Sequence, residues 1–513
     1  MLAWRQLSIF WRIPVLHCLA RNSLDRPRDT VCSIAIRSGE CGDDFAQECQ
    51  RIDSSIVIFL DRASLSSATN GPAIKFVDYH LRENQFQHVY QLEQTHPLLE
   101  GLPRTVSIYG PGPIVTPLQV EIGMEVLVSL HGIPIVALHR HRLLIGADPW
   151  QFGHPSVPML YNVLANWLVR DGRIKLRKFV PVAAIRLDDL PATAENLRAN
   201  PVTKKLDRSR CKILKKLRRF ARRRNIKFTL MYSSHFTKNK SFVPISTVTP
   251  RSIRQIQLGI KQRVFELGSH GMVHLRDCSD LSTGDPREFS DLDAEATVKH
   301  LETSENEIVR LFGDRPRSFV APAWGYRPQV TKEIAGERYP IIIDSSQHVE
   351  SGVAAVFAEG RKGHTYFNMV ETFRSGGRML TYSNADFWKC YSAAGIPVHY
   401  MQHTDTNWHI LRKFLESKTD FRSERLKRNV RSRLLHVAQN PSRPRSLRVF
   451  SAAVMSVFCW LEPSSWRPLW MMLTSSSLYA IVRAMKLGGY RCVTVSELMT
   501  FIDRTDTAEN YFH

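Results

Sequence analysis

The sequence predicts an α/β protein in which parallel strands alternate with helices. Three observations lead to this prediction. Short apolar runs of strand length recur along the chain, stretches with helical spacing of apolar residues lie between several of them, and polar residues directly follow the strands. Strands that alternate with helices form parallel βαβ units. In such sheets the chemistry lies at the carboxyl ends of the strands. The 513 residues are enough for more than one domain.

The first part of the chain is predicted to contain a smaller α/β domain over residues 51–175, after a segment, 1–50, that shows little periodicity and is left unassigned. Apolar periodicity supports this prediction. It gives strands over 56–60, 74–78, 105–109, 125–130, 135–138 and 142–146, and a helix over 161–170.

Part of this domain resembles the glutamine-amidotransferase-like superfamily. The resemblance lies in HPLLEGL at 96–102, IVAL at 135–138 and LIGADPW at 144–150. Amidotransferase chemistry needs a cysteine on a tight strand-to-helix turn, and residues 50–210 contain no cysteine. The resemblance therefore implies a scaffold or binding module without catalytic activity.

A second region of alternating strands and helices begins near residue 180. Strands are predicted over 181–187, 226–231, 264–268, 318–321, 341–343 and 396–402, with a helix over 293–312. Residues 406–477 do not follow this alternation. They are predicted to be a helical insertion rich in basic and aromatic residues, before the pattern resumes at 478–502.

The net charge of +22 is concentrated in one stretch, because residues 204–227 hold 13 Lys/Arg and one Asp. Apolar residues recur there at helical spacing, which predicts an amphipathic helix with a basic outer face. These residues are Ile213, Leu214, Leu217, Phe220 and Ala221. Such a face is either simply solvated or holds an anionic polymer by electrostatics. No zinc-finger or RNA-recognition signature accompanies it, so nucleic acid is not expected as a partner.

Two pairs of polar residues stand at predicted strand ends. Asp188 and Asp189 follow the strand 181–187; His270 follows a later strand, and His274 lies four residues further on. Successive side chains on a strand point to opposite faces, so the two aspartates are expected to have different roles. Histidines four residues apart can project to one side of a helical turn and hold one metal ion.

Asp189, His270 and His274 together make a two-histidine, one-carboxylate metal site that leaves positions open for water and substrate. A divalent ion there lowers the pKa of bound water to roughly 7 and polarises a carbonyl. Zn²⁺ is the first candidate, and the ligand set also suits other divalent metals. The simpler interpretation is a strand cap and ordinary polar contacts. The occurrence of both motifs in order, each at a strand end, favours the metal site.

Several segments resemble motifs of the polysaccharide deacetylase family, the NodB-homology domain of carbohydrate esterase family 4. They are IRLDD at 185–189, ELGSHGMVH at 266–274, FVAPAWGY at 319–326, ID at 343–344, IPVHYMQHTD at 396–405, and GYRCVTVSEL at 489–498. The resemblance implies an incomplete (β/α) barrel over 180–405 plus 478–502, preceded by the smaller α/β domain. It also implies an enzyme that removes acetyl groups from N-acetylated sugars.

The resemblance implies a role for each residue of the two strand-end pairs. Asp188 corresponds to the catalytic base of the family. Asp189, His270 and His274 correspond to its metal ligands.

The remaining motifs imply the substrate groove and the general acid. Pro322, Trp324 and Tyr326 correspond to the wall of the groove that binds substrate. The acid corresponds to His399 or His403, which share one face of the predicted strand. His403 is preferred because it lies at the carboxyl end, where the metal would be.

The chain departs from the family pattern beside the base. Leu190-Pro191 follows where a glycine is usual, and the place of the arginine that supports the base is apolar, with Arg317 a little earlier. These differences resemble divergent branches that read R-x-D-D. They bear on substrate and rate more than on metal binding.

The combined prediction is a metal-dependent hydrolase of non-peptide carbon–nitrogen amide bonds, with a carbohydrate as its substrate. The alternatives are a hydrolase of a non-sugar amide and an inactive protein that binds carbohydrate or anionic polymer. Nine scattered cysteines without a C-x-x-C pair predict reduced thiols. With no clear export signal and no transmembrane segment, a cytoplasmic location is expected. The sequence does not determine the oligomeric state.

Overall fold

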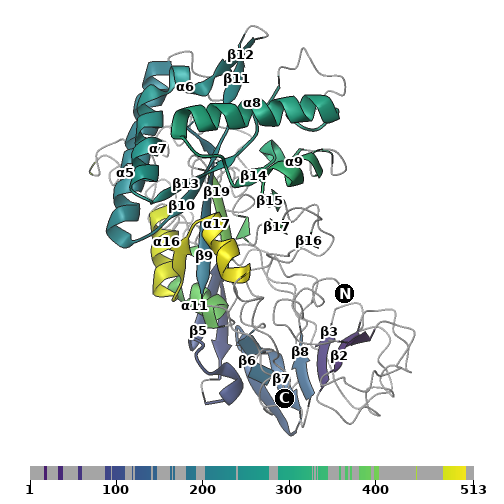
Figure 1. The fold of residues 1–513 in the computed structure, drawn as a ribbon. Coiled ribbons are helices and arrows are strands. Elements are labelled where there is room, and N and C mark those ends of the chain that lie inside the picture. Colours follow the sequence, from purple (N-terminus) through teal and green to yellow (C-terminus); the bar gives the residue numbers. More distant parts are fainter. Residues whose placement is uncertain are drawn as a thin grey trace, which may run out of the picture.

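The computed structural model describes residues 17–19, 33–37, 56–60, 87–93, 95–109, 118, 122–139, 142–146, 162–163, 166–167, 181–191, 203–238, 241–276, 287–325, 327, 331, 333–344, 358–359, 364–367, 370–371, 381–393, 398–403, 446 and 478–503. Within them the architecture is mixed α/β, with two large sheets and a small hairpin. In Figure 1 the first sheet lies at the bottom, and the second runs upward from it with helices on its flanks.

The first sheet has eight strands in the order β1-β2-β3-β8-β7-β6-β4-β5. Pairing is parallel from β1 to β8 along this order and antiparallel from β8 to β5. The strands are β1 His17–Leu19, β2 Ser33–Arg37, β3 Ile56–Leu60, β4 Gln87–Leu92, β5 Thr105–Tyr109, β6 Met124–Leu130, β7 Ile133–His139 and β8 Arg142–Ile145.

The structure therefore contains the strands predicted near 56–60, 105–109, 125–130, 135–138 and 142–146. The strands β1 and β2 lie in the segment that was left unassigned, and β4 has no predicted counterpart. The strand predicted over 74–78 lies outside the described residues, as does nearly all of the predicted insertion 406–477. The division into domains stays a prediction.

The second sheet has ten strands and is mainly parallel. Its order is β16-β17-β15-β14-β13-β10-β9-β19-β18, and β20 also pairs with β9. The strands are β9 Val182–Leu190, β10 Phe228–Tyr232, β13 Phe265–Ser269, β14 Ser318–Val320, β15 Ile341–Asp344, β16 Ala358–Glu359, β17 His364–Phe367, β18 Val370–Glu371, β19 Val398–His403 and β20 Arg491–Val493. This curled parallel sheet agrees with the predicted alternation of strands and helices.

β9 is the central strand of this sheet and has two apolar faces. On the outer face Ala183, Ile185 and Leu187 share a core with Leu214 and Leu217 of the basic helix.

On the inner face Val182 and Ala184 share a second core with Val320, Ile343 and Val493. A parallel strand that is covered on both sides needs such a continuous apolar run. Arg186 and Asp188 interrupt it on the inner face, where both are buried.

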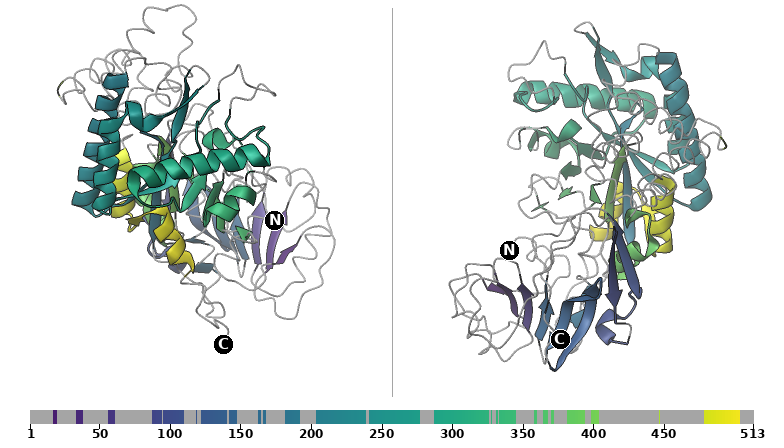
Figure 2. Two further views of the ribbon diagram at one scale, coloured as in Figure 1. Left: turned by 45° about the horizontal axis from the view of Figure 1, so that its top comes forward. Right: turned by 180° about the vertical axis from the view of Figure 1, so that it is seen from behind.

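Helices pack around the second sheet. The basic stretch forms α5, Thr203–Arg224, whose buried side includes Leu214, Leu217 and Ala221 as predicted from the periodicity. The others are α6 Ile245–Val248, α7 Pro250–Lys261, α8 Ala294–Phe312, α9 Glu333–Arg338, α11 Ala385–Ala393, α16 Leu478–Leu487 and α17 Val495–Asp503. The views in Figure 2 show α5 and α7 side by side on one flank and α8 on another. No described helix is both long and apolar enough to cross a membrane.

The amino end of α17 closes the sheet at the end away from the aspartates. Thr494 and Glu497 form a reciprocal capping box, with backbone-to-side-chain hydrogen bonds of 3.2 and 3.1 Å. Glu266 of β13 accepts hydrogen bonds from the Ser496 backbone at 3.3 Å and the Thr229 hydroxyl at 3.2 Å, both on its Oε1. Desolvation by burial raises the pKa of Glu266 above its ordinary value.

Glu266→Gln is expected to be tolerated and to change the pH dependence of stability. The amide oxygen can keep both hydrogen bonds, while the cost of burying a carboxylate disappears. The pKa of Glu266 is higher in the folded state than in the unfolded state. The wild type therefore loses stability as the pH rises from the unfolded-state pKa of Glu266 toward its folded-state pKa. The free energy of unfolding of the variant, measured in urea, should equal or exceed that of the wild type at pH 8. The advantage of the variant in unfolding free energy should shrink toward pH 4. An advantage that is smaller at pH 8 than at pH 4 would contradict this expectation.

Candidate metal centre

The carboxyl end of β9 carries a bulge that separates its two aspartates. Leu187 pairs with Leu230 of β10, but the next pair is Leu190 with Tyr232, so β9 has one residue more than its partner. Asp189 lies in this bulge with a left-handed backbone, φ 64°. Asp188 keeps the inward direction of Arg186, and Asp189 is turned toward a different neighbour. A bulge re-aims side chains in this way.

The histidines come from an irregular segment that directly follows β13. His270 lies next to the strand end, where its backbone N–H donates to the Tyr232 carbonyl at 3.0 Å. Gly271 and His274 have left-handed backbones, φ 74° and 49°. The expected helical turn is therefore wrong, because residues 270–276 form no helix. The two reversals of the backbone bring the side chains together instead.

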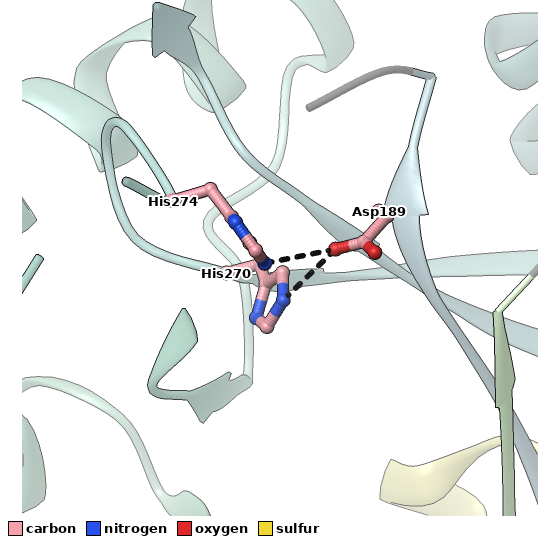
Figure 3. A group of neighbouring side chains, drawn as sticks. All are labelled: Asp189, His270 and His274. Atoms are coloured by element: carbon pink, nitrogen blue, oxygen red, sulfur yellow. Dashed lines mark ion pairs between the residues drawn. The ribbon is translucent and has the colours of Figure 1, made fainter. Parts of the chain in front are cut away.

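Asp189, His270 and His274 converge at one point (Figure 3). Oδ1 of Asp189 lies 3.4 Å from Nε2 of His270 and 3.2 Å from Nε2 of His274. One ligand atom from each residue lies within 4.8 Å of the others. Among the described residues, this is the group of His, Cys, Asp and Glu side chains with the spacing of a metal site.

The hydrogen bonding of His270 determines what its second nitrogen can do. Nδ1 lies 3.0 Å from the carbonyl oxygen of Val320, which can only accept, so Nδ1 carries a proton. Without a second proton, the ring presents a lone pair on Nε2 toward the Asp189 carboxylate, which is also an acceptor. Two acceptors that face each other need a cation between them, either an added proton or a metal ion.

The distances fit a metal ion. Bonds of about 2.0–2.2 Å from a tetrahedral ion to nitrogen and oxygen place neighbouring ligand atoms roughly 3.3–3.5 Å apart. The two separations of 3.2 and 3.4 Å from Asp189 come close to this edge length. With three protein ligands, further coordination positions are left for water and substrate.

Asp188 is held by an arginine that precedes it on the same strand. Nε and Nη2 of Arg186 each lie 2.8 Å from a different oxygen of Asp188, and the two residues are 0% and 2% exposed. One of these contacts is a hydrogen bond and the other an ion-pair contact, and together they restrain the carboxylate. Arg317, the arginine nearest in sequence to the place usual in the family, is exposed. Asp188 is thus supported by Arg186, two residues earlier and hence on the same strand face.

The histidine segment is clamped by Glu288, which the sequence interpretation missed. This fully buried carboxylate accepts the backbone N–H groups of Met272 at 2.9 Å and Val273 at 3.2 Å. Nδ1 of His300 lies 2.9 Å from its Oε1. These contacts fix the backbone immediately before His274. No local sequence signal indicated Glu288, because a single carboxylate between two predicted elements has the same pattern as an exposed loop residue.

The two candidate acids occupy different levels of β19. His403 is in register with Asp188, and His399 is in register with Ala184, four residues deeper. His399 is completely buried, and burial together with the positive charge of Arg186 holds its pKa well below the ordinary value. A neutral buried ring is a poor proton donor, which favours His403. The side chain of His403 lies outside the described residues.

The predicted groove wall is described only in part. Pro322 is buried and packs against Gly271. If Gly271 carried a Cβ, that atom would lie 3.0 Å from Cγ of Pro322. Trp324 ends a short 3-10 turn, Pro322–Trp324, and its side chain lies outside the described residues, as does all of Tyr326. Their role as a groove wall stays a prediction.

Comparisons with known proteins give distant structural similarity and nothing closer. No family model matches the sequence, and no curated protein matches it. A Mycobacterium smegmatis protein assigned as a polysaccharide deacetylase is 13% identical, with a TM-score of 0.31, over 48% of this chain and 86% of its own. The Xyl-CE4 domain of a xylanase from the hindgut metagenome of Trinervitermes trinervoides is 13% identical, with a TM-score of 0.29, over 65% and 95%.

A CE4-family pseudoenzyme from Bacillus anthracis is also similar, at 11% identity and a TM-score of 0.24, over 46% of this chain and 61% of its own. Similarity at this level assigns neither a family nor an activity.

Gly271→Ala is expected to disrupt the histidine segment. A Cβ there would clash with Oε2 of Glu288 and lie 2.9 Å from Phe289, at a φ of 74°. Backbone strain and overpacking together should cost about 3 kcal/mol or more of unfolding free energy. Gly313→Ala is the matched control, since its φ is 90° and no described atom lies within 4 Å of the added Cβ. It should cost only about 1–2 kcal/mol. Equal losses in urea denaturation would contradict the proposed clamp.

Arg186 and Asp188 are expected to be strongly coupled in stability. Arg186→Met should cost about 3–5 kcal/mol, because it leaves a buried carboxylate without its cation. Adding Asp188→Asn in the same chain should recover a large part of this loss. A double-mutant cycle by chemical denaturation measures the coupling, and additive losses would show that the pair is not an energetic unit.

Proposed function

We propose that this protein is a metal-dependent hydrolase that removes acetyl groups from N-acetylated carbohydrate. The observation that carries the proposal is the meeting of Asp189, His270 and His274, with acceptor atoms facing one another at metal-ligand spacing. The buried Arg186–Asp188 pair immediately beside it adds a fixed carboxylate that is not one of the three converging ligands. The carbohydrate part of the proposal is supported by the motif resemblance of the sequence.

A divalent cation bound by Asp189, His270 and His274 would polarise an acyl carbonyl and lower the pKa of a water molecule that it coordinates. Zn²⁺ is the first candidate, and the donor set also suits other divalent ions. The protein contributes the rest of the chemistry. Asp188 takes a proton from the attacking water, and Arg186 holds its carboxylate in the required plane.

His403 is proposed to protonate the amine that leaves. Its backbone lies opposite Asp188 in the register of β19 with β9. A base on one strand and an acid on the next would then flank the scissile bond, as amide hydrolysis requires. Val320 keeps the proton of His270 on Nδ1, so that Nε2 remains available as a ligand.

Metal binding is tested by replacing the histidines. The wild type is expected to hold one equivalent of divalent metal after purification and dialysis against Zn²⁺, measured by elemental analysis. His270→Ala/His274→Ala should lose it, because one carboxylate alone binds weakly. His131→Asn is the control, since His131 lies in the turn between β6 and β7 of the first sheet, at a φ of 52° that asparagine tolerates. Unchanged metal content in the double variant would refute the metal centre.

Catalysis is tested by Asp188→Asn. The variant should retain its metal, because Asp188 is not one of the converging ligands. Release of acetate from N-acetylated oligosaccharides should fall by about 10²–10⁴-fold, the usual contribution of a general base. Wild-type rates in this variant would exclude Asp188 as the base. Absence of acetate release from every N-acetylated substrate by the metal-loaded wild type would exclude the deacetylase proposal.

A further inference from the structure

Three neighbouring helices, α5, α7 and α16, form a strongly cationic outer surface, the cationic face. Across these helices the single acidic residue is Asp207, and it is buried. The exposed Lys and Arg side chains of α5 alone are Arg208, Lys212, Lys215, Lys216, Arg219, Arg222, Arg223 and Arg224.

The helices are packed into one continuous surface. Asp207 of α5 accepts hydrogen bonds from Ser252 at the start of α7, at 2.9 Å to the backbone N–H and 2.7 Å to the hydroxyl. At the other end of α5, Phe220 meets Tyr479 of α16 edge to face, with ring centroids 4.7 Å apart. Both α7 and α16 add exposed cations, among them Arg254 and Arg483. Figures 1 and 2 show α5 and α7 side by side in every view.

The cationic face begins at the edge of the sheet that carries the candidate metal centre. The strand β9 ends at this edge, and α5 then runs back along the sheet in the opposite direction before β10 begins. The cap that Asp207 provides places the start of α7 at the same end. Along α5 the exposed cations recur every three to four residues, or about every 5–6 Å, over a helix roughly 33 Å long.

Ordinary solvation does not account for this charge pattern. The other long helix, α8, carries both acidic and basic residues, and its Arg310 forms an ion pair with Glu307 at 2.7 Å. On α5, like charges three and four residues apart repel one another, which costs a few tenths of a kcal/mol for each pair. A surface that accumulates this repulsion gains stability when an anionic chain neutralises it.

The aromatic and apolar side chains of the cationic face indicate which kind of anion it binds. The aromatic side chains of the three helices, Phe220 and Tyr479, are half-buried against each other, so no exposed ring is offered for stacking on bases. The exposed side of α5 also carries no large apolar side chain for insertion into a membrane. Among the described residues of the three helices, the exposed large apolar side chain is Leu487 at the end of α16, and one such side chain is too little for membrane insertion. The face therefore recognises spaced anionic groups by charge.

We propose that the cationic face binds an acidic polysaccharide, and that this polymer is the substrate whose N-acetyl groups reach the metal centre. The inference rests on the proposed deacetylase function and narrows its substrate to chains that carry carboxylate, sulfate or phosphate groups. The sugar at the metal centre is held by the site, and the anionic groups along the rest of the chain are held by α5 and its neighbours.

The experiment compares two hexasaccharides with the full-length, metal-loaded protein. One is from hyaluronan, which alternates N-acetylated sugars with uronic acids, and the other is neutral N-acetylchitohexaose. At low ionic strength the acidic oligosaccharide should bind about tenfold more tightly, and added salt should remove the difference, since exposed charges are screened. Arg208→Gln/Lys212→Gln/Lys215→Gln, in the half of α5 nearer the metal centre, should weaken binding of the acidic oligosaccharide about tenfold and leave the neutral one unchanged.

The matched control neutralises three exposed cations away from the cationic face. In Lys299→Gln/Arg315→Gln/Arg317→Gln, the binding of both oligosaccharides should match the wild type. Equal loss in both triple variants, or equal affinity of the wild type for both oligosaccharides, would overturn the inference. Binding of duplex DNA of similar length without binding of the hyaluronan hexasaccharide would overturn it in favour of nucleic acid.

Turnover separates this inference from the proposed function. With the acidic substrate the triple variant on α5 should show a raised KM and an unchanged kcat. This result is expected when a lost contact had stabilised the bound substrate and the transition state equally. Deacetylation of the neutral oligosaccharide with no effect of the α5 variant on any acidic substrate would overturn the inference and leave the deacetylase intact. Charge-dependent binding at α5 without acetate release from any substrate would remove the proposed function and leave the polymer site.

Discussion

The burial of Arg186 and Asp188 on the inner face of β9 is the constraint on which the rest of the second sheet depends. This strand pairs with β10, β19 and β20, so the charges cannot move out of the sheet without breaking three sets of hydrogen bonds. Removing two charges from water costs several kcal/mol for each ion, and only a well-formed pair offsets that cost. The two contacts of 2.8 Å supply it. The pair therefore places two hydrogen-bonding side chains inside an otherwise apolar strand.

Adjacent residues of one strand receive different environments because the strand is irregular at that point. Regular alternation alone would point Asp189 to the outer face, among the residues that pack against α5. The extra residue in β9 and the left-handed backbone of Asp189 turn it toward the histidines instead. Strain of this kind persists only where surrounding contacts support it. Here the support comes from the neighbouring strands β10 and β19.

The histidines reach the same point by a different route, through a loop whose backbone is held by side chains from elsewhere. Glu288 binds the backbone N–H groups of Met272 and Val273, and Val320 orients the ring of His270. Such an arrangement is preorganised, so the ligands do not have to be ordered when a metal binds. The cationic face, which begins at the same end of the sheet, adds a long-range component. A fixed short-range site beside an extended field of one sign is suited to a charged, chain-like substrate.

The sequence by itself determined many of the strands and the residue types of the site, although β1, β2 and β4 were not predicted. Short runs rich in apolar residues predicted β3, β5, β9, β13 and β19, and helical spacing of apolar residues predicted the amphipathic α5. Asp188, Asp189, His270 and His274 could be recognised because two pairs of carboxylate and imidazole groups, each at a predicted strand end, indicate a metal site. Only the tertiary structure decided how these residues meet. The bulge in β9, the turn that replaces the expected helix at His274, and the clamp by Glu288 depend on register and on contacts between distant segments. The periodicity of a single segment contains no information about such contacts, and for the same reason Arg186 was recognisable as a charge in a strand but not as the partner of Asp188.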